Sequence, residues 1–190
     1  MSIITIFNYY NDPKNMIPLY NILHHIKTGK YKNLITKLRN YYEDDPGGEF
    51  DSLVRSIPRF SVAGNFTMKK DKLKMVSYSG NLLLEIPYLN DRDRKSVKEL
   101  LMKDPFVMAC FENALKSGLV ILVHGNGRSE RHQTNYRAAV RYYKNLTGAK
   151  FFALGGMRFD HTCMVSLDED IYIAVGADSI TEHLNGLVKV

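Results

Sequence analysis

Several segments and motifs that would define an activity are missing from this chain of 190 residues. No run approaches the roughly 18 apolar residues of a membrane-spanning helix, and the N-terminus lacks the basic region and cleavage site of a signal peptide. The P-loop, Rossmann and nucleophile-elbow motifs are also absent, which excludes the chemistry that each of them supports. We therefore expect a cytoplasmic protein with no membrane partner.

Cysteines and metal-ligand patterns are scarce. The chain has two cysteines, Cys110 and Cys163, and a protein of this length does not need a disulfide, so we expect two buried thiols in a reducing cytosol. The six histidines are scattered, and none has a cysteine or a second histidine at the ligand spacing of a zinc site on one element. We predict neither a zinc site nor a cofactor.

The composition of the chain is that of a globular protein. Apolar residues make up 45% of the sequence and charged residues 24%, and the chain is long enough to bury one large core. The sequence contains no internal repeat, low-complexity tract or linker. Predicted strands and helices begin and finish it, so we interpret residues 1–190 as one complete domain.

Basic charge is unevenly distributed along the chain, whose formal net charge is +6. Residues 151–190 contain two basic and six acidic residues, whereas residues 1–150 contain 24 basic and 14 acidic residues. This split favours an acidic partner, such as nucleic acid, that contacts the main body through its phosphates. The alternative is a solvated lysine-rich face that only aids solubility.

Predicted strands and helices are interspersed along the chain. Runs of β-branched, aromatic and leucine residues predict strands at residues 3–9, 59–67, 72–79, 82–88, 106–112, 119–124, 163–167 and 171–175. Apolar residues at helical spacing predict helices at residues 15–29, 31–42, 50–56, 91–103 and 130–146, and a last short helix from residue 179. Breaker residues predict turns or loops at residues 11–13 and 43–48. This order favours an α+β domain with a mixed, mainly antiparallel sheet flanked by helices.

Residues 75–90 contain the most informative arrangement. The strand 82–88 is a continuous apolar run, typical of a central strand buried on both faces, and it carries Glu85 near its end. A carboxylate there can hold a metal ion against phosphates, and such sites usually have a second carboxylate two residues further on, because residues i and i+2 point the same way. That position is Pro87, which cannot bind a metal. The pattern indicates a nucleotidyl-transferring scaffold that has lost its chemistry; the alternative is that Glu85 only pairs with a nearby lysine.

The order of further motifs resembles a known family. Residues 31–39 are similar to a helix that ends in an arginine, and residues 55–58 to a basic residue followed by Leu-Pro. Residues 60–66 are similar to a segment that closes Ser-Gly-x-Phe, and residues 163–172 to closing Cys-x-x-Ser and Asp-x-x-Tyr strands. The chain thus resembles the VirE-type, BT4734-like N-terminal domains of bacteria and their mobile elements, which are related to the archaeo-eukaryotic primase-polymerases. The resemblance covers most of the chain and implies a primase-polymerase-like fold with an RRM-like core.

Each active-site motif of that family is altered in this chain. Where the family strand ends in two acids around a hydrophobic residue, this chain has Glu85 and Pro87. The family's Ser-Pro-Ser-Gly-x-Gly-Leu-Lys loop corresponds to residues 113–120, which keep only Gly118 and the following leucine, and His161 replaces an arginine. The resemblance therefore implies a vestigial site without catalytic residues or a metal, made up of Glu85, Pro87, Gly118, Asp160 and His161. Weak binding of Mg²⁺ or Mn²⁺ at Glu85 stays open.

Our leading hypothesis is a catalytically degenerate primase-polymerase-like domain that binds nucleic acid or assists DNA replication or mobile-element machinery. Two surfaces are predicted to contact phosphates, a lysine-rich hairpin and the arginine face of the helix 130–146. Their residues are Lys69, Lys70, Lys72, Lys74, Arg131, Arg137 and Arg141. Tyr78 and Tyr88 lie nearby in sequence and are candidates for stacking on bases. Two alternatives stay open: an active metal-dependent nucleotidyltransferase with a reduced acidic set, and a protein-interaction module that uses the old cleft.

Overall fold

The computed structural model describes residues 2–8, 12–44, 48–181 and 183. In this part of the chain five α-helices accompany strands that pair only in the antiparallel sense, so the predicted α+β class is confirmed. The strands form two four-stranded sheets and a two-stranded ribbon, where the sequence suggested one sheet. No helix of the described residues is both long and apolar enough to cross a membrane.

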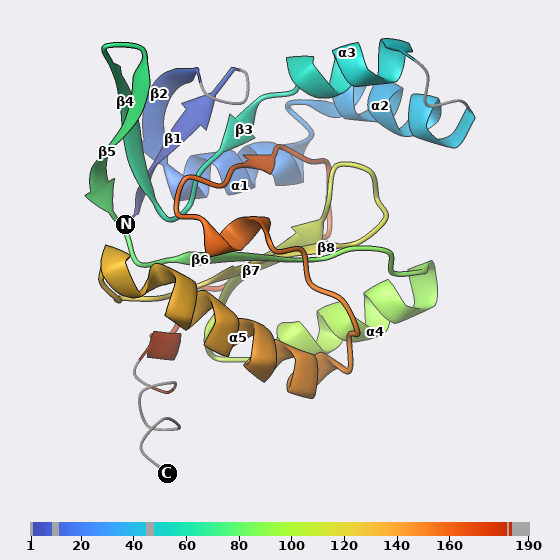
Figure 1. The fold of residues 1–190 in the computed structure, drawn as a ribbon. Coiled ribbons are helices and arrows are strands. Elements are labelled where there is room, and N and C mark those ends of the chain that lie inside the picture. The colour runs from blue at the N-terminus through green and yellow to red at the C-terminus, as the bar shows by residue number, and fades with distance from the viewer. Residues whose placement is uncertain (1, 9–11, 45–47, 182, 184–190) are drawn as a thin grey trace.

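The first sheet forms the middle layer of the molecule (Figure 1). Its strand order is β10-β7-β8-β6, and its strands are β6 (Leu82–Ile86), β7 (Val107–Glu112), β8 (Leu119–Val123) and β10 (Tyr172–Ile173). All five residues of β8 are buried, because helices and other strands cover both faces of the sheet. The predicted strands 106–112 and 119–124 are therefore confirmed, and β8 is the buried central strand.

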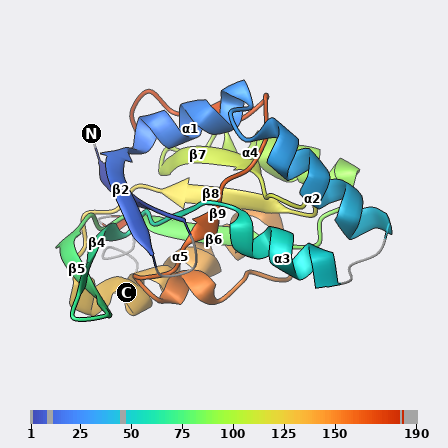
Figure 2. The ribbon, with the colours of Figure 1, turned by 90° about the horizontal axis from the view of Figure 1, so that it is seen from above.

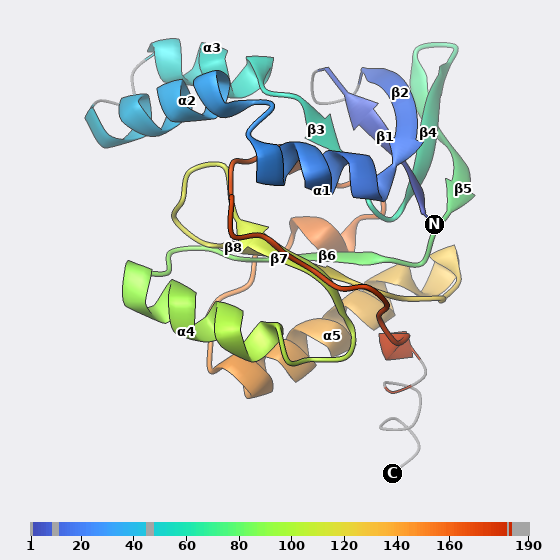
Figure 3. The same ribbon diagram turned by 180° about the vertical axis from the view of Figure 1, so that it is seen from behind.

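Helices α4 (Asp91–Leu101) and α5 (His132–Thr147) cover one face of this sheet, as Figure 3 shows from behind. Helix α4 begins where the side chain of Asn90 accepts a hydrogen bond from the backbone N–H of Asp93. Helix α5 follows the short 3₁₀ helix η1 (Ser129–Arg131) and ends at Gly148, whose φ of 69° is left-handed. Both helices were predicted within two residues of their observed ends.

The second sheet and three helices lie over the other face. The strand order is β2-β1-β3-β9, with β1 (Ile3–Phe7), β2 (Pro13–Pro18), β3 (Arg59–Phe60) and β9 (Cys163–Met164). Figure 2 shows α1 (Leu19–Thr28), α2 (Lys32–Asp44) and α3 (Gly48–Ser56) from above. Helix α1 ends at Gly29, as predicted, with a left-handed φ of 72°.

The predicted helix start at residue 15 is wrong. Residues 13–18 form strand β2, which pairs with β1, and helix α1 begins only at Leu19. Pro13 and Pro18 stand at the two ends of this edge strand, where a missing N–H is tolerated, and Pro18 also precedes the first turn of α1. Pairing with β1 therefore decides the conformation of residues 13–18, of which only Ile17 belongs to the apolar series that continues through α1.

The predicted strand 59–67 is divided into two strands. After β3 the Ser61 N–H donates to the Thr5 carbonyl, and the chain then bends at Val62 and Ala63 before it enters β4 (Gly64–Lys69). Strand β4 pairs with β5 (Lys72–Tyr78) alone, and we call this pair the basic ribbon. Its turn residues Lys70 and Asp71 both have left-handed backbones, with φ of 51° and 57°, as in a type I′ hairpin.

Strand β6 is at the edge of its sheet and not at its centre, although four of its five residues are buried. Its outer edge is covered by a segment that contains the 3₁₀ helix η2 (Gly155–Met157). The N–H of Ala153 donates to the Glu85 carbonyl at 2.9 Å, and Gly156 packs directly on the Leu83 carbonyl. This cover explains how an apolar run typical of a central strand occupies an edge.

The last predicted elements are shorter than expected. Strands β9 and β10 contain two residues each, where the sequence predicted strands 163–167 and 171–175. Most of the helix predicted from residue 179 lies outside the described residues, as do parts of the predicted turn at 11–13 and loop at 43–48.

Replacing Gly156 with alanine is expected to destabilise the fold by roughly 2–3 kcal/mol, because the new methyl group would overlap the Leu83 carbonyl and the Tyr136 ring. Urea unfolding would measure the change in free energy. Gly176→Ala is the matched control, since no atom lies within 4 Å of the added carbon. Equal stability of the two variants would contradict this account of the covered edge.

Candidate functional site

The carboxylate of Glu85 is held by a neighbouring amide. Asn113 donates from Nδ2 to Glu85 Oε1 at 3.0 Å, and its own Oδ1 accepts from the backbone N–H of Ser117 at 3.0 Å. Glu85 is half-buried at the end of β6, and the described residues place no lysine within ion-pair distance of it. Within this part of the chain the observed partner of Glu85 is thus Asn113, and the pairing of Glu85 with a lysine stays an unconfirmed alternative.

Pro87 and Gly118 are brought together by their backbones. A Cβ on Gly118 would overlap the Ile86 carbonyl and lie 2.9 Å from the Pro87 Cα. The Ser117 carbonyl accepts from the Leu89 N–H at 2.8 Å, which closes this end of the sheet. Glycine is thus required at position 118, because a side chain there would prevent the loop from packing against Ile86 and Pro87.

Asp160 and His161 follow η2 and are both committed to local contacts. Arg158 forms two hydrogen bonds to the Asp160 carboxylate, at 2.8 and 2.7 Å, and these hold the pKa of Asp160 below its ordinary value. Burial lowers the pKa of His161, and the positive charge of Arg59 lowers it further. A neutral imidazole does not supply the permanent positive charge of an arginine.

Arg59 brings a buried positive charge to this region. Its residue is 7% exposed on β3, opposite Met164 of β9. Burial raises the pKa of the adjacent Cys163 thiol, the charge of Glu85 raises it further, and the charge of Arg59 opposes both. Cys163 therefore lies within electrostatic range of both Glu85 and Arg59. Cys163 and Cys110 are both buried and free, as predicted.

A buried histidine connects the basic ribbon to helix α5. His132 is 2% exposed, and its Nε2 lies 2.9 Å from the Gly156 carbonyl, which can only accept. Nδ1 of the neutral ring therefore accepts from the Tyr78 hydroxyl, at 2.8 Å. Burial lowers the pKa of His132 and raises that of Tyr78 to about 12. Tyr78 is thus engaged in the core, whereas Tyr88 is 81% exposed.

The predicted phosphate-contacting residues lie on two separate surfaces. Lys69 and Lys72 are opposite each other in the ribbon, and Lys74 is two residues further on the same face. Arg131, Arg137 and Arg141 are exposed on η1 and α5, on the far side of the middle sheet. Figures 1 and 3 both show the ribbon tip pointing away from α5. A short nucleic-acid segment would therefore contact either the ribbon lysines or the arginines of η1 and α5, and not both.

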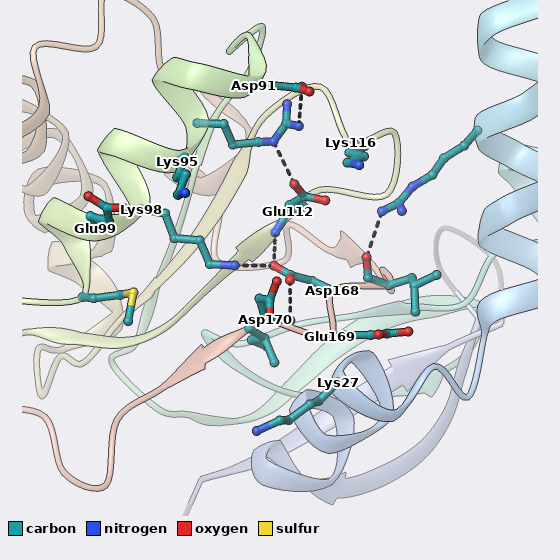
Figure 4. Close-up of a pocket in the computed structure, with 15 residues that line it drawn as sticks. Lys27, Asp91, Lys95, Lys98, Glu99, Glu112, Lys116, Asp168, Glu169 and Asp170 are labelled. Carbon is teal, nitrogen blue, oxygen red and sulfur yellow. Dashed lines mark hydrogen bonds and ion pairs between the residues drawn. The ribbon is translucent and has the colours of Figure 1, made fainter.

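A third site was not predicted, a charged cleft of about 970 Å³ between α1, α2 and α4 (Figure 4). Its centre is the side chain of Asp168, which is 5% exposed and accepts from Lys98 Nζ at 2.8 Å and from the Glu112 N–H at 2.9 Å. The ammonium of Lys98 reaches Asp168 from α4. This buried pair joins α4 to the loop before β10.

Arg94 forms a second buried ion pair beside the first. Its side chain is 7% exposed and donates to Glu112 at 2.9 Å, to Asp91 at 2.7 Å and to the Leu89 carbonyl at 3.1 Å. Arg39 approaches from α2 and donates to the carbonyls of Ala114 at 3.0 Å and Leu167 at 2.9 Å. Burial lowers the pKa of Arg39, and the charges of Glu112 and Asp168 oppose that shift.

The sequence of α4 contains a signal for part of this cleft. Arg94, Val97 and Leu101 recur at spacings of three and four and share the buried face of α4. A charged residue on an otherwise apolar helix face indicates a buried partner. The partners themselves, Glu112 and Asp168, are brought together only by the fold.

Metal ligands are not grouped in the described residues, since no cluster of three or more His, Cys, Asp or Glu side chains there is arranged to hold an ion. Glu85 has Asn113 as its polar neighbour, and Asp160 has Arg158. Weak binding of Mg²⁺ or Mn²⁺ at Glu85 stays a prediction.

Comparison with known proteins identifies the family. Residues 52–173 match the family model described as the BT4734-like, N-terminal domain. The chain therefore belongs to the family of BT4734-like, N-terminal domains, as the sequence motifs indicated. A search of curated proteins and a search of solved structures each found no match.

Replacing Asp168 with asparagine is expected to destabilise the protein by about 3 kcal/mol, because it leaves the ammonium of Lys98 buried without its counter-charge. The neighbouring Glu169→Gln change is the control. Glu169 is 73% exposed and only 3.8 Å from Lys32, so its loss should cost less than about 0.5 kcal/mol. Chemical unfolding of both variants measures the difference, and similar losses would show that the Asp168 pair is not structural.

Proposed function

We propose that this domain binds nucleic acid through the basic ribbon and that it is a catalytically degenerate relative of the primase-polymerases. The observation that carries the proposal is the shape and charge of the ribbon. A two-stranded β-ribbon is narrow enough to enter the major groove of a duplex, and lysines along it neutralise phosphates on either side. The ribbon pairs with no other strand among the described residues and lies beside β1 and β2 at the side of the molecule (Figure 1).

The ribbon presents one cationic face and one apolar face. Thr67, Lys69, Lys72 and Lys74 share the exposed face, and none of these lysines forms an ion pair within the described residues. Phe66 is buried on the opposite face, in ring contact with Phe7 and Phe159. Packing on one side thus fixes which side the lysines present to a ligand. Lys70 adds a fourth charge at the turn.

Helix α5 offers a second, weaker surface for the same kind of ligand. Arg137 and Arg141 are four residues apart on its exposed side, with Arg131 just before the helix. We infer that this surface contributes when a bound strand is long enough to pass around the molecule from the ribbon.

The altered motifs support the loss of nucleotidyl transfer. Two-metal transfer needs carboxylates that clamp both ions against a triphosphate. Here Pro87 occupies the second carboxylate position, the Glu85 carboxylate accepts from an amide, and burial favours the neutral form of His161 by lowering its pKa. We propose that the domain works without a cofactor in the cytoplasm, as an accessory to DNA replication or to the machinery of a mobile element.

Charge reversal on the ribbon is expected to weaken nucleic-acid binding. The double variant Lys72→Glu, Lys74→Glu should lower the affinity for labelled duplex and single-stranded DNA or RNA and reduce the salt slope of log K by about 2. Fluorescence anisotropy at several salt concentrations measures both. The control is Lys37→Glu with Lys103→Glu. These two lysines are exposed on α2 and just after α4, away from the ribbon, so the control makes the same change in net charge and should have a smaller effect.

Two results would contradict nucleic-acid binding by the ribbon. The first is an absence of salt-sensitive binding to any of these nucleic acids at low salt. The second is an equal loss of affinity in the two double variants, because the effect would then follow net charge and not the ribbon. A stable protein partner that binds in place of nucleic acid would favour the alternative of a protein-interaction module.

Nucleotidyl transfer is expected to be absent. Primer-synthesis and nucleotide-incorporation assays with Mg²⁺ and with Mn²⁺ should give no product above that of the Glu85→Ala variant. Metal-dependent incorporation by the natural sequence that disappears in Glu85→Ala would instead establish an active enzyme with a reduced acidic set.

A further inference from the structure

The charged cleft around Asp168 is lined by six cationic and six acidic side chains, and four of the acidic ones are engaged in ion pairs. Arg94 and Lys98 hold three of its carboxylates, and Glu169 faces Lys32. Within the described residues, the cationic lining residues left without an ion pair are Lys27, Arg39, Lys95 and Lys116, and the acidic ones are Glu99 and Asp170. The groups that remain available therefore favour an anionic ligand.

Arg39 is the most strongly positioned of these cations. Its guanidinium donates to the backbone carbonyls of Ala114 and Leu167, which orient it, and no carboxylate of the described residues forms an ion pair with it. Arginine has further N–H groups in the same plane, and these suit the oxygens of a phosphate. Lys116 lies two residues after Ala114 in the same loop, and both Arg39 and Lys116 line the cleft.

The remaining cations surround the opening from other elements. Figure 4 shows Lys95 on α4, Lys116 on the loop after β7 and Lys27 on α1, on different sides of Asp168. The unpaired Glu99 lies at the opposite side of the view from Lys116. A phosphate near Lys116 and Arg39 is therefore kept apart from that carboxylate.

Part of the lining is apolar, which distinguishes the cleft from a simple anion site. Leu167 and Ile171 line it together with Met102, whose residue is 44% exposed. The volume of about 970 Å³ is within the range of small-molecule sites. An apolar wall beside a cationic one matches a ligand with an organic group at one end and phosphate at the other.

We propose that the charged cleft binds a phosphorylated small molecule, with its phosphate on Arg39 and Lys116 and its organic group against Met102 and Leu167. The ion pairs of Arg94 and Lys98 form the floor of this site and hold α4 in place. The proposal goes beyond nucleic-acid binding by the ribbon and does not rest on it.

Isothermal titration with adenosine monophosphate, inorganic pyrophosphate and adenosine tests the proposal on the full chain. Saturable binding of the monophosphate is expected, tighter than that of either fragment, because only it contacts both walls. The double variant Lys95→Glu, Lys116→Glu should weaken this binding at least about tenfold. Both lysines are exposed, so the variant should fold, and circular dichroism checks this.

The ribbon variant Lys72→Glu, Lys74→Glu is the matched control and should bind the monophosphate as the natural sequence does. Conversely, the cleft variant should keep its nucleic-acid affinity, so failure of one proposal is separate from failure of the other. An absence of saturable binding by the monophosphate would overturn the site. Binding that is unchanged in the cleft variant, or weakened equally in the ribbon variant, would overturn it as well.

Discussion

The covered edge of β6 is the constraint on which much of the structure depends. This strand is buried on both faces but has a sheet neighbour on one side only, so its free carbonyls need donors or close cover from elsewhere. Ala153 and Gly156 provide that cover. The position of Gly156 in turn gives His132 its acceptor, and His132 then accepts from Tyr78 at the base of the ribbon. The direction of the ribbon is thus connected, through three contacts, to the strand that carries Glu85.

Much of the fold was predictable because its core elements are locally consistent. The apolar runs of β7 and β8 and the helical spacing in α4 and α5 agree with the final structure. The errors occur where pairing with a distant strand decides the conformation or the position of a segment. Strand β2 directly precedes the helical spacing of apolar residues in α1, but its own residues form an edge strand beside β1. The composition of β6 indicates burial correctly, yet burial by a covering segment and burial by a neighbouring strand have the same sequence pattern.

The candidate sites can also be divided into those that the local sequence predicts and those that only the fold brings together. Glu85, Pro87 and Gly118 were recognised from motifs, and the fold does bring Gly118 against the backbone beside Pro87. The ribbon lysines were predictable as a face because alternation on a strand is local. The charged cleft was not predictable, because Arg39, Arg94, Glu112 and Asp168 come from four distant segments. Arg59 was missed for a similar reason, since its charge matters only beside Cys163 and His161, which follow it by about a hundred residues.

The isolation of the basic ribbon has a consequence for how the protein behaves in concentrated solution. Strand β4 packs against β1 and β2, whereas β5 pairs only with β4 among the described residues, and an unpaired strand edge of this kind joins readily to the edges of other molecules. Lysines at Lys69, Lys72 and Lys74 place like charges along any such junction, which would repel a second copy of the same ribbon. The same lysines would therefore have two roles, to bind a ligand and to repel a second copy of the ribbon. A ribbon without charge would lose its protection against self-association before any change in its ligands became visible.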